Sequence, residues 1–159
     1  AEDRVRGLTR EQLTWSDGGW SIQENLGHLL TLEPLWDQRL DDFLAGKPML
    51  RAADMENRAT HDAKFNGQSV QDILGDLRRT RLAQVARLER LTAEDFARVS
   101  IHPRLKGPMR LLDGVMFVCE HDDYHMARIA EILGSGPGGS PQIRGKTVAG
   151  LNRGPAGRR

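Results

Sequence analysis

The stretch His121-Asp122-Asp123-Tyr124-His125 decides how the fold of this chain is interpreted, because its two histidines are four residues apart. The run that contains it has the apolar periodicity of one continuous helix, which we expect to begin at Pro108 and to end at Leu133, just before Gly134. Four residues are slightly more than one helical turn. Both imidazole rings should therefore project from the same helix face, close enough to bind one metal ion.

The face that carries these two histidines is otherwise apolar. Its other members are Leu111, Gly114, Val118, Ile129 and Ile132. This pattern predicts that the histidines point into the interior of a helical bundle rather than into solvent. Neutral imidazole binds zinc, nickel, copper or iron(II), and a bound metal offsets part of the cost of burying the rings.

Two further long helices and a short one are expected upstream. Ser21 and Glu24 form a capping-box pattern, which predicts a helix over residues 21–45. A second apolar periodicity predicts a helix over residues 69–91, and residues 2–13 form a short, charged stretch of helical character.

The connections between these helices complete the predicted fold. Periodicity fails over residues 46–68, a connection long enough to cross over the bundle and to border a functional site, and residues 101–108 are expected to form an irregular loop. We therefore predict an all-α four-helix bundle with a long crossover connection over residues 1–133. Residues 134–159 hold eight glycines and three prolines, which predicts a flexible C-terminal tail. The first helix is short, so either its remaining part lies upstream of Ala1 or a partner subunit of a homodimer covers the gap.

Composition argues against several classes of function. Net charge is +1, but residues 135–159 hold five basic residues and no acidic one, which leaves 18 basic and 22 acidic side chains elsewhere. This balance and the low aromatic content of 5% argue against nucleic-acid binding. No apolar run reaches the roughly 20 residues that span a bilayer, and no signal peptide is visible. The single cysteine, Cys119, excludes an internal disulfide, fits a cytoplasmic protein and is expected to be a small core residue.

A third metal ligand is expected on another helix, because sites that process substrates usually have three protein ligands and an open position. The candidate is His28, at the edge of the apolar stripe of the helix over residues 21–45. The residues alone leave an alternative open. In that alternative His28 is an ordinary boundary histidine, and His121 and His125 are hydrogen-bonded core groups.

Two carboxylates are candidate catalytic residues. Asp122 flanks the histidine face and could orient a histidine or activate a bound water, with a solvated helix acid as the alternative. Glu33 lies near the centre of an apolar stripe, where a carboxylate needs a partner such as an arginine or a metal-bound water. The loop residues His61 and His102 are weaker candidates for the open side of a metal.

Two segments of the chain resemble the signatures of the DinB/YfiT-like superfamily. The first runs from Trp20 to Leu29 and continues with Glu33, Trp36 and Arg39. The second comprises His102 to Leu105, Gly107, Glu120 to His125 and Arg128-Ile129. The two segments cover most of residues 15–133, and their order and separation match the family.

This resemblance implies a four-helix bundle in which three histidines bind a divalent metal, commonly nickel or zinc, with iron and manganese as alternatives. Carried over residue by residue, the ligands are His28, His121 and His125. Two features depart from the family pattern: a full-length first helix is not evident, and Lys106 precedes the glycine of the second signature.

The predicted function follows from this site. Three neutral ligands leave a divalent cation its full charge, which favours an anionic ligand such as hydroxide or thiolate in the open positions. The chain offers no dedicated nucleophile. We therefore expect an enzyme that acts on a small molecule with a low-molecular-weight thiol, of the S-transferase or isomerase type that the resemblance implies. Metal-dependent hydrolysis is one alternative. A non-catalytic, stress-related metal-binding bundle is another, and a fourth protein ligand would favour it.

Overall fold

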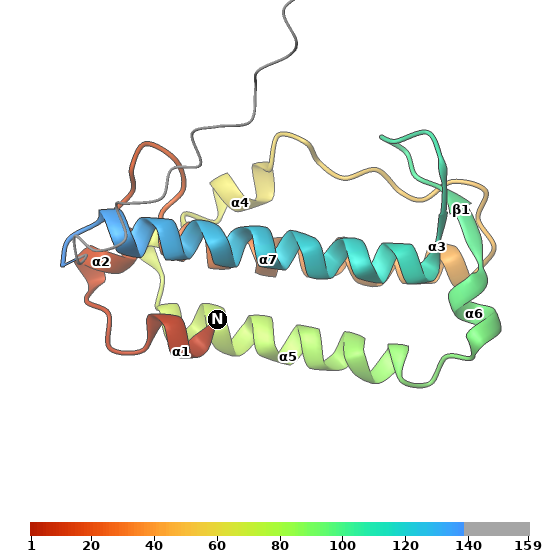
Figure 1. The fold of residues 1–159 in the computed structure, drawn as a ribbon, viewed down its shortest axis with the longest axis horizontal. Helices are drawn as coiled ribbons and strands as arrows, with labels where there is room; N and C mark the ends of the chain where they lie inside the picture. Colours follow the sequence, from red (N-terminus) through yellow and green to blue (C-terminus); the bar gives the residue numbers. More distant parts are fainter. Residues whose placement is uncertain (139–159) are drawn as a thin grey trace, which may run out of the picture.

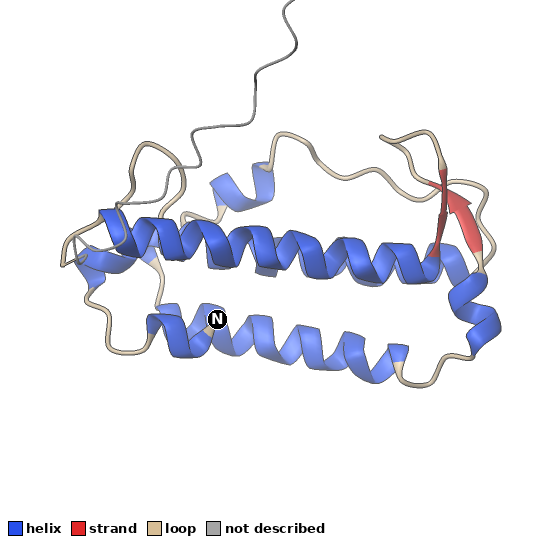
Figure 2. Ribbon diagram, viewed as in Figure 1, coloured by secondary structure: helices blue, strands red, loops and turns tan. Residues whose placement is uncertain are grey.

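The computed structural model describes residues 1–138, so the predicted tail lies outside the described residues from Gly139 onward. In chain order the elements are α1 (Glu2–Val5), α2 (Arg10–Thr14), α3 (Ile22–Leu44), α4 (Arg58–Asp62), the 3-10 helix η1 (Phe65–Gly67), α5 (Val70–Leu88), α6 (Ala93–Ala97), β1 (Val99–Ile101), β2 (Pro108–Arg110) and α7 (Leu111–Ser135). Helices make up most of the described chain, and one short hairpin stands at the end of the bundle (Figure 2). The predicted all-α class is confirmed.

Three long helices, α3, α5 and α7, form the body of the bundle (Figure 1). α3 is central, because it packs along both α5 and α7. α3 and α5 run in the same direction and α7 runs in the opposite one. The chain between α3 and α5 therefore returns along the length of the bundle, as the predicted crossover requires, and it carries α4 and η1 on its way.

The two helix starts that the sequence predicts at Ser21 and Ser69 are observed. The Ser21 side chain accepts from the Glu24 backbone N–H at the start of α3, and the Glu24 carboxylate accepts from the Ser21 N–H. Ser69 caps α5 through the N–H of Asp72. These caps satisfy backbone donors that would otherwise lack partners in the first turn of each helix.

The N-terminal segment forms two short helices rather than the single one that we predicted for residues 2–13. Gly7 separates them with a left-handed backbone (φ +78°), a conformation that glycine adopts without steric cost. α1 lies against both α5 and α7, since Arg78 pairs with Glu2 at 3.3 Å and Arg4 donates to the carbonyl of Met126 at 3.4 Å. α1 therefore occupies part of the place that the fourth helix of the bundle would fill.

A hairpin replaces the irregular loop that we predicted for residues 101–108. β1 and β2 pair antiparallel, with Ser100 opposite Met109, and α7 begins after this pairing at Leu111 rather than at Pro108. The β-branched residues of β1 favour an extended backbone. The hydrogen bond from Leu111 N–H to the carbonyl of Arg98 closes the hairpin, so the helix can start only after it.

Buried apolar side chains form two clusters along α3. The first comprises Val5, Leu13, Ile22, Leu26, Phe65, Val70, Ile73, Ile129 and Ile132. The second comprises Leu40, Phe43, Leu50 and Leu111. The histidines of α3 and α7 lie between these two clusters in the sequence of both helices.

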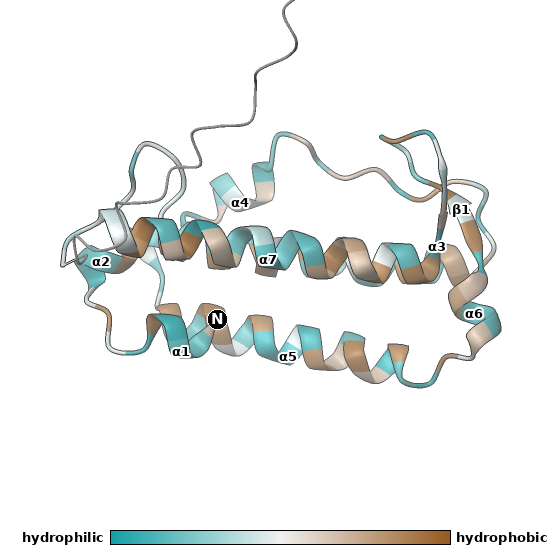
Figure 3. Ribbon diagram, in the orientation of Figure 1, coloured by the Kyte–Doolittle hydropathy of each residue, from teal (hydrophilic) through white to brown (hydrophobic). Residues whose placement is uncertain are grey.

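Figure 3 colours the ribbon by hydropathy, and hydrophobic residues occur along both α5 and α7. The large hydrophobic side chains that are exposed on these two helices are Leu82, Val85, Leu112, Met116 and Tyr124. Among the described residues, no helix combines the length and the apolar character that crossing a bilayer requires.

Candidate metal centre

The structure brings the three histidines that we predicted as ligands together between α3 and α7. One ring nitrogen from each of His28, His121 and His125 lies within 4.8 Å of those of the other two. The ring centroids are 4.6 Å apart for the pair on α7, and 4.8 Å and 5.3 Å apart between His28 and that pair. A single ion could contact all three rings after small side-chain adjustments, because typical metal–nitrogen distances are about 2 Å.

The His125 ring is held by an amide on the facing helix. Its Nδ1 lies 2.8 Å from Oδ1 of Asn25, while the amide nitrogen of Asn25 donates to the carbonyls of Trp20 and Ser21. Those two bonds fix the amide with its oxygen toward the ring. Nδ1 must therefore carry the proton, and the Nε2 lone pair of His125 is free to bind a metal.

The His28 ring is oriented by two threonine hydroxyls. Thr31 Oγ1 donates to the carbonyl of His28 at 2.9 Å, Thr31 and Thr60 hydroxyls lie 2.9 Å apart, and Thr60 Oγ1 lies 3.0 Å from Nδ1 of His28. Each hydroxyl has one proton. All three contacts are satisfied only if Thr60 donates to Thr31 and accepts from Nδ1–H, which again leaves Nε2 as the lone-pair nitrogen.

The third histidine has an unused polar atom. Nδ1 of His121 is buried and makes no hydrogen bond to any residue among those that the structure describes. A buried polar atom without a partner is costly, and a metal ligand or a bound water would remove the cost. The nearest carboxylate oxygen, Oδ1 of Asp122, is 3.9 Å away, beyond hydrogen-bond distance.

Burial keeps the two most enclosed rings neutral. Loss of solvent, followed by the charges of the other histidines, lowers the pKa of His28 to about 3. Burial and then His121 lower the pKa of His125 to about 4, although Asp122 opposes the shift. Neutral imidazole is the form that binds metals, so these rings are ready to act as ligands near neutral pH. The donor set fits a divalent transition metal.

The three-histidine cluster borders a cavity of about 260 Å³. His28 and His121 contribute to its wall, and the remaining side chains come from α3, α7, the crossover connection and the hairpin loop. The cavity gives a small molecule access to the side of the histidines that the bundle does not cover. Trp20 covers another side, with its ring centroid 4.5 Å from that of His28.

The two candidate carboxylates are not part of the three-histidine group, and they share one arginine. Arg81 of α5 donates to Oε1 of Glu33 at 2.5 Å and to Oδ2 of Asp122 at 2.5 Å. Burial alone would raise the pKa of Asp122, but the neighbouring His121 ring and the Arg81 guanidinium lower it. Glu33, 3% exposed, has a second oxygen without any partner among the described residues. The arginine ion pair that we considered as the alternative for Glu33 is therefore present.

The three remaining candidates from the sequence, His102, His61 and Cys119, differ in their burial. His102 lines the cavity and is buried, whereas His61 is exposed and its ring faces Trp20 at 5.9 Å. Cys119 is exposed, so its expected place in the core was wrong. The reason is that its face of α7 is not covered by another helix.

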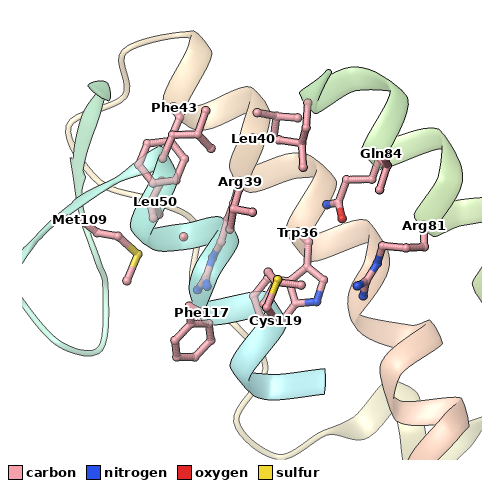
Figure 4. A pocket seen from close by; sticks show the side chains of 16 residues that line it. Trp36, Arg39, Leu40, Phe43, Leu50, Arg81, Gln84, Met109, Phe117 and Cys119 are labelled. Atoms are coloured by element: carbon pink, nitrogen blue, oxygen red, sulfur yellow. The ribbon is translucent and has the colours of Figure 1, made fainter. Parts of the chain in front are cut away.

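A second cavity, of about 140 Å³, lies between α3, α5 and α7 (Figure 4). It is separated from the histidines by side chains that also line the first cavity: Trp36, Arg39 and Phe117. Cys119 and Gln84 lie on its wall. Sequence reasoning missed Asn25, Thr60 and Arg39 as parts of the site, although two of them stand in the first signature segment.

Comparisons with known proteins agree with this fold. A sequence model of the DinB superfamily matches residues 1–129. No match was found among curated proteins. A solved structure, described as "YfiT from Bacillus subtilis is a probable metal-dependent hydrolase with an unusual four-helix bundle topology", superposes with a TM-score of 0.71 and 24% sequence identity, covering 82% of this chain and 76% of that chain. It shares the bundle topology described above.

Proposed function

Because this chain belongs to the DinB superfamily, we propose that it is a metal-dependent enzyme whose divalent cation is bound by His28, His121 and His125. The observation that carries the proposal is the convergence of three imidazoles beside a cavity of about 260 Å³. Two of the rings have their lone pairs fixed by hydrogen bonds to neighbouring side chains. Nickel and zinc suit this donor set best, with iron and manganese as alternatives.

The ligand count supports catalysis over a purely structural site. Among residues 1–138, the group contains three histidines and no fourth histidine, cysteine or carboxylate. A structural zinc site has four protein ligands, whereas three leave positions for water or substrate. This distinction favours an enzyme over the non-catalytic, stress-related bundle.

A cation in this site would act as a Lewis acid and lower the pKa of a thiol or a water that it binds. Asn25 and Thr60 hold two of the imidazoles in the required tautomer. Leu32, Trp36 and Phe117 line the cavity and limit the access of water. Asp122 is the nearest carboxylate to His121, at 3.9 Å from its Nδ1, and Arg81 holds it there.

We further propose that the cosubstrate is a low-molecular-weight thiol that enters the cavity. The thiol is either transferred to a small-molecule substrate or assists the isomerisation of that substrate. The chain supports this reading because its one cysteine lies on the wall of the other cavity. The thiol must therefore be supplied from outside. Metal-dependent hydrolysis is the second candidate, supported by the description of the YfiT structure as a probable hydrolase.

Metal binding is tested with untagged protein purified without chelators. Mass spectrometry should find about one divalent ion per chain. The His125→Ala variant should lose it, while His61→Ala, which removes an exposed histidine outside the cluster, should retain it. Equal metal content in His125→Ala and the unmodified protein would contradict the assignment.

The two chemistries are separated with cobalt(II)-substituted protein. A thiol bound at the cation gives an intense sulfur-to-cobalt absorption band, and 2-mercaptoethanol is a suitable probe. If the band forms and a thiol-dependent transfer is found with electrophilic small molecules, the transferase is supported. Absence of the band, together with turnover of ester or amide substrates, would support the hydrolase instead.

A further inference from the structure

The wall of the histidine cavity contains a buried arginine without an acidic partner. Arg39 is 7% exposed, and no carboxylate of the described residues lies within ion-pair distance of it. Its Nε donates to the carbonyl of Arg51 at 3.1 Å, and its guanidinium carbon lies 5.5 Å from the ring centroid of Trp36. The two terminal nitrogens make no hydrogen bond to a described residue.

A guanidinium that is largely buried and has no ion-pair partner is less stable than one in water or in an ion pair. Burial lowers the pKa of Arg39; the charge of Asp42 opposes this shift, and the smaller repulsion from Arg104 adds to it. Asp42 is itself bound to Arg51. The arrangement at Arg39 is therefore one that an anion from outside the chain would stabilise.

A second donor faces the same cavity. His102 is 3% exposed, and its Nδ1 accepts the backbone N–H of Leu105 at 3.1 Å. The neutral ring must then carry its proton on Nε2, which makes Nε2 a donor. Arg104, which is exposed at the rim, adds positive charge near both His102 and Arg39.

The one acidic residue of the described chain that lines this cavity offsets only part of its positive charge. Asp54 lines the cavity, but its carboxylate accepts the backbone N–H groups of Glu56 and Arg58 at 3.0 and 2.9 Å. Its capacity as an acceptor is largely used within its own turn. With Arg39 and Arg104 against Asp54, the charged side chains that line the cavity keep a net positive charge.

We infer that this wall is a carboxylate-binding subsite, and that the substrate or the thiol cosubstrate carries a carboxylate that Arg39 and His102 bind. The reacting end of the same molecule then faces His28 and His121, which also line the cavity. The inference rests on the proposed function for the identity of the reacting end. The planar guanidinium fork matches a carboxylate, and one buried positive charge balances a monoanion better than a doubly charged phosphate.

The subsite is tested by nuclear magnetic resonance titration of the full-length protein, both as purified and after removal of metal by a chelator. Butanoate and the uncharged butanamide are the matched probes. Butanoate should shift the side-chain signals of Arg39 and His102 in both preparations, and butanamide should not. The Arg39→Gln variant should weaken butanoate binding by roughly tenfold or more, whereas Arg39→Lys should retain part of it.

A second variant, at the exposed rim, keeps the test decisive if Arg39→Gln fails to fold. Arg104→Gln changes an exposed side chain, so it leaves the core intact, and it should weaken butanoate binding about two- to threefold at low salt. Equal binding of butanoate and butanamide, or butanoate affinity unchanged in Arg104→Gln and in Arg39→Gln, would overturn the inference. Tighter binding of inorganic phosphate than of butanoate would overturn the choice of carboxylate.

The same experiment distinguishes this inference from the proposed function. If butanoate binds only when metal is present and does so independently of Arg39, the subsite is wrong and the metal centre stands. If butanoate binds to the wall but no preparation retains metal, the subsite stands and the metal-dependent function fails. In cobalt(II) protein, 3-mercaptopropanoate should give the sulfur band at lower concentration than 3-mercaptopropanamide, and Arg39→Gln should abolish the difference.

Discussion

Nδ1 of His28 donates to Oγ1 of Thr60 across 3.0 Å, so the crossover connection that follows α3 orients this proposed metal ligand. Thr60 is 4% exposed and belongs to α4. The connection therefore does more than join α3 to α5. It completes the metal centre, because without its hydroxyl the His28 ring would lose the acceptor that fixes its tautomer.

We predict that Thr60→Val weakens metal binding by about 10- to 100-fold, the usual effect of removing a hydrogen-bond partner of a ligating histidine. Valine has the shape of threonine but no hydroxyl. Thr60→Ser is the matched control, since it keeps the acceptor, and it should bind metal within a few-fold of the unmodified chain. Competition with a chromophoric chelator measures both. Equal affinities for the valine and serine variants would contradict the role of Thr60.

The buried ion pairs of Arg81 predict a large effect on stability. Arg81→Met leaves Glu33 without either of its hydrogen bonds, in a site where that carboxylate is 3% exposed. The free energy of unfolding should fall by about 3–5 kcal/mol. Arg79→Met on the same helix removes an exposed pair with Asp76 and should cost less than about 1 kcal/mol.

Urea denaturation of metal-free protein provides the measurement, and a double variant sharpens it. Arg81→Met combined with Glu33→Leu removes the uncompensated charge, so it should be more stable than Arg81→Met alone. A double variant that is less stable than the single one would show that the cost arises from packing rather than from the unpaired carboxylate.

We predict that acid lowers the free energy of unfolding through Asp42, which binds Arg51 in the connection after α3. Asp42 accepts two bonds from the guanidinium and one from the backbone N–H of Arg51, and these lower its pKa from 3.8 to about 2. A lowered carboxyl pKa contributes stability above pH 3.8 that is lost as pH falls through 2. With solvent screening at the half-exposed Arg51, the contribution is on the order of 1–2 kcal/mol. The unfolding free energies of the unmodified chain and Asp42→Asn should therefore differ at pH 7 and converge as pH approaches 2. A constant difference would contradict this assignment.

The long helices and the histidine pair on α7 were predictable because each rests on periodicity or on a short motif. The caps at Ser21 and Ser69 and the four-residue spacing of His121 and His125 act within one helix turn, where sequence determines geometry directly. The prediction that His28 joins this pair needed two further observations: its place on the apolar edge of α3 and the family resemblance.

The parts that could not be predicted depend on contacts between distant segments. Thr60 lies where periodicity fails, so its approach to His28 follows only from the path of the crossover. The hairpin follows from pairing of β1 with β2 and from the bridge between Ile101 and Met49. The exposure of Cys119 depends on how little of the α5 and α7 surface α1 covers.

The close approach of η1 to α3 yields the last prediction. A Cβ atom at Gly27, next to His28, would lie 2.2 Å from the ring of Phe65, closer than any real contact. Gly27→Ala must therefore displace Phe65, which is 3% exposed, and with it the connection that carries Thr60. The free energy of unfolding should fall by about 1–3 kcal/mol, the usual cost of overpacking a core, and metal affinity should fall with it.

Gly75→Ala is the control, because a Cβ there meets nothing within 4 Å. In the interior of α5 that change should stabilise the chain by roughly 0.5–1 kcal/mol. Urea denaturation and chelator competition on both variants measure these effects, and a Gly27→Ala protein as stable as Gly75→Ala would show that η1 does not constrain the metal centre.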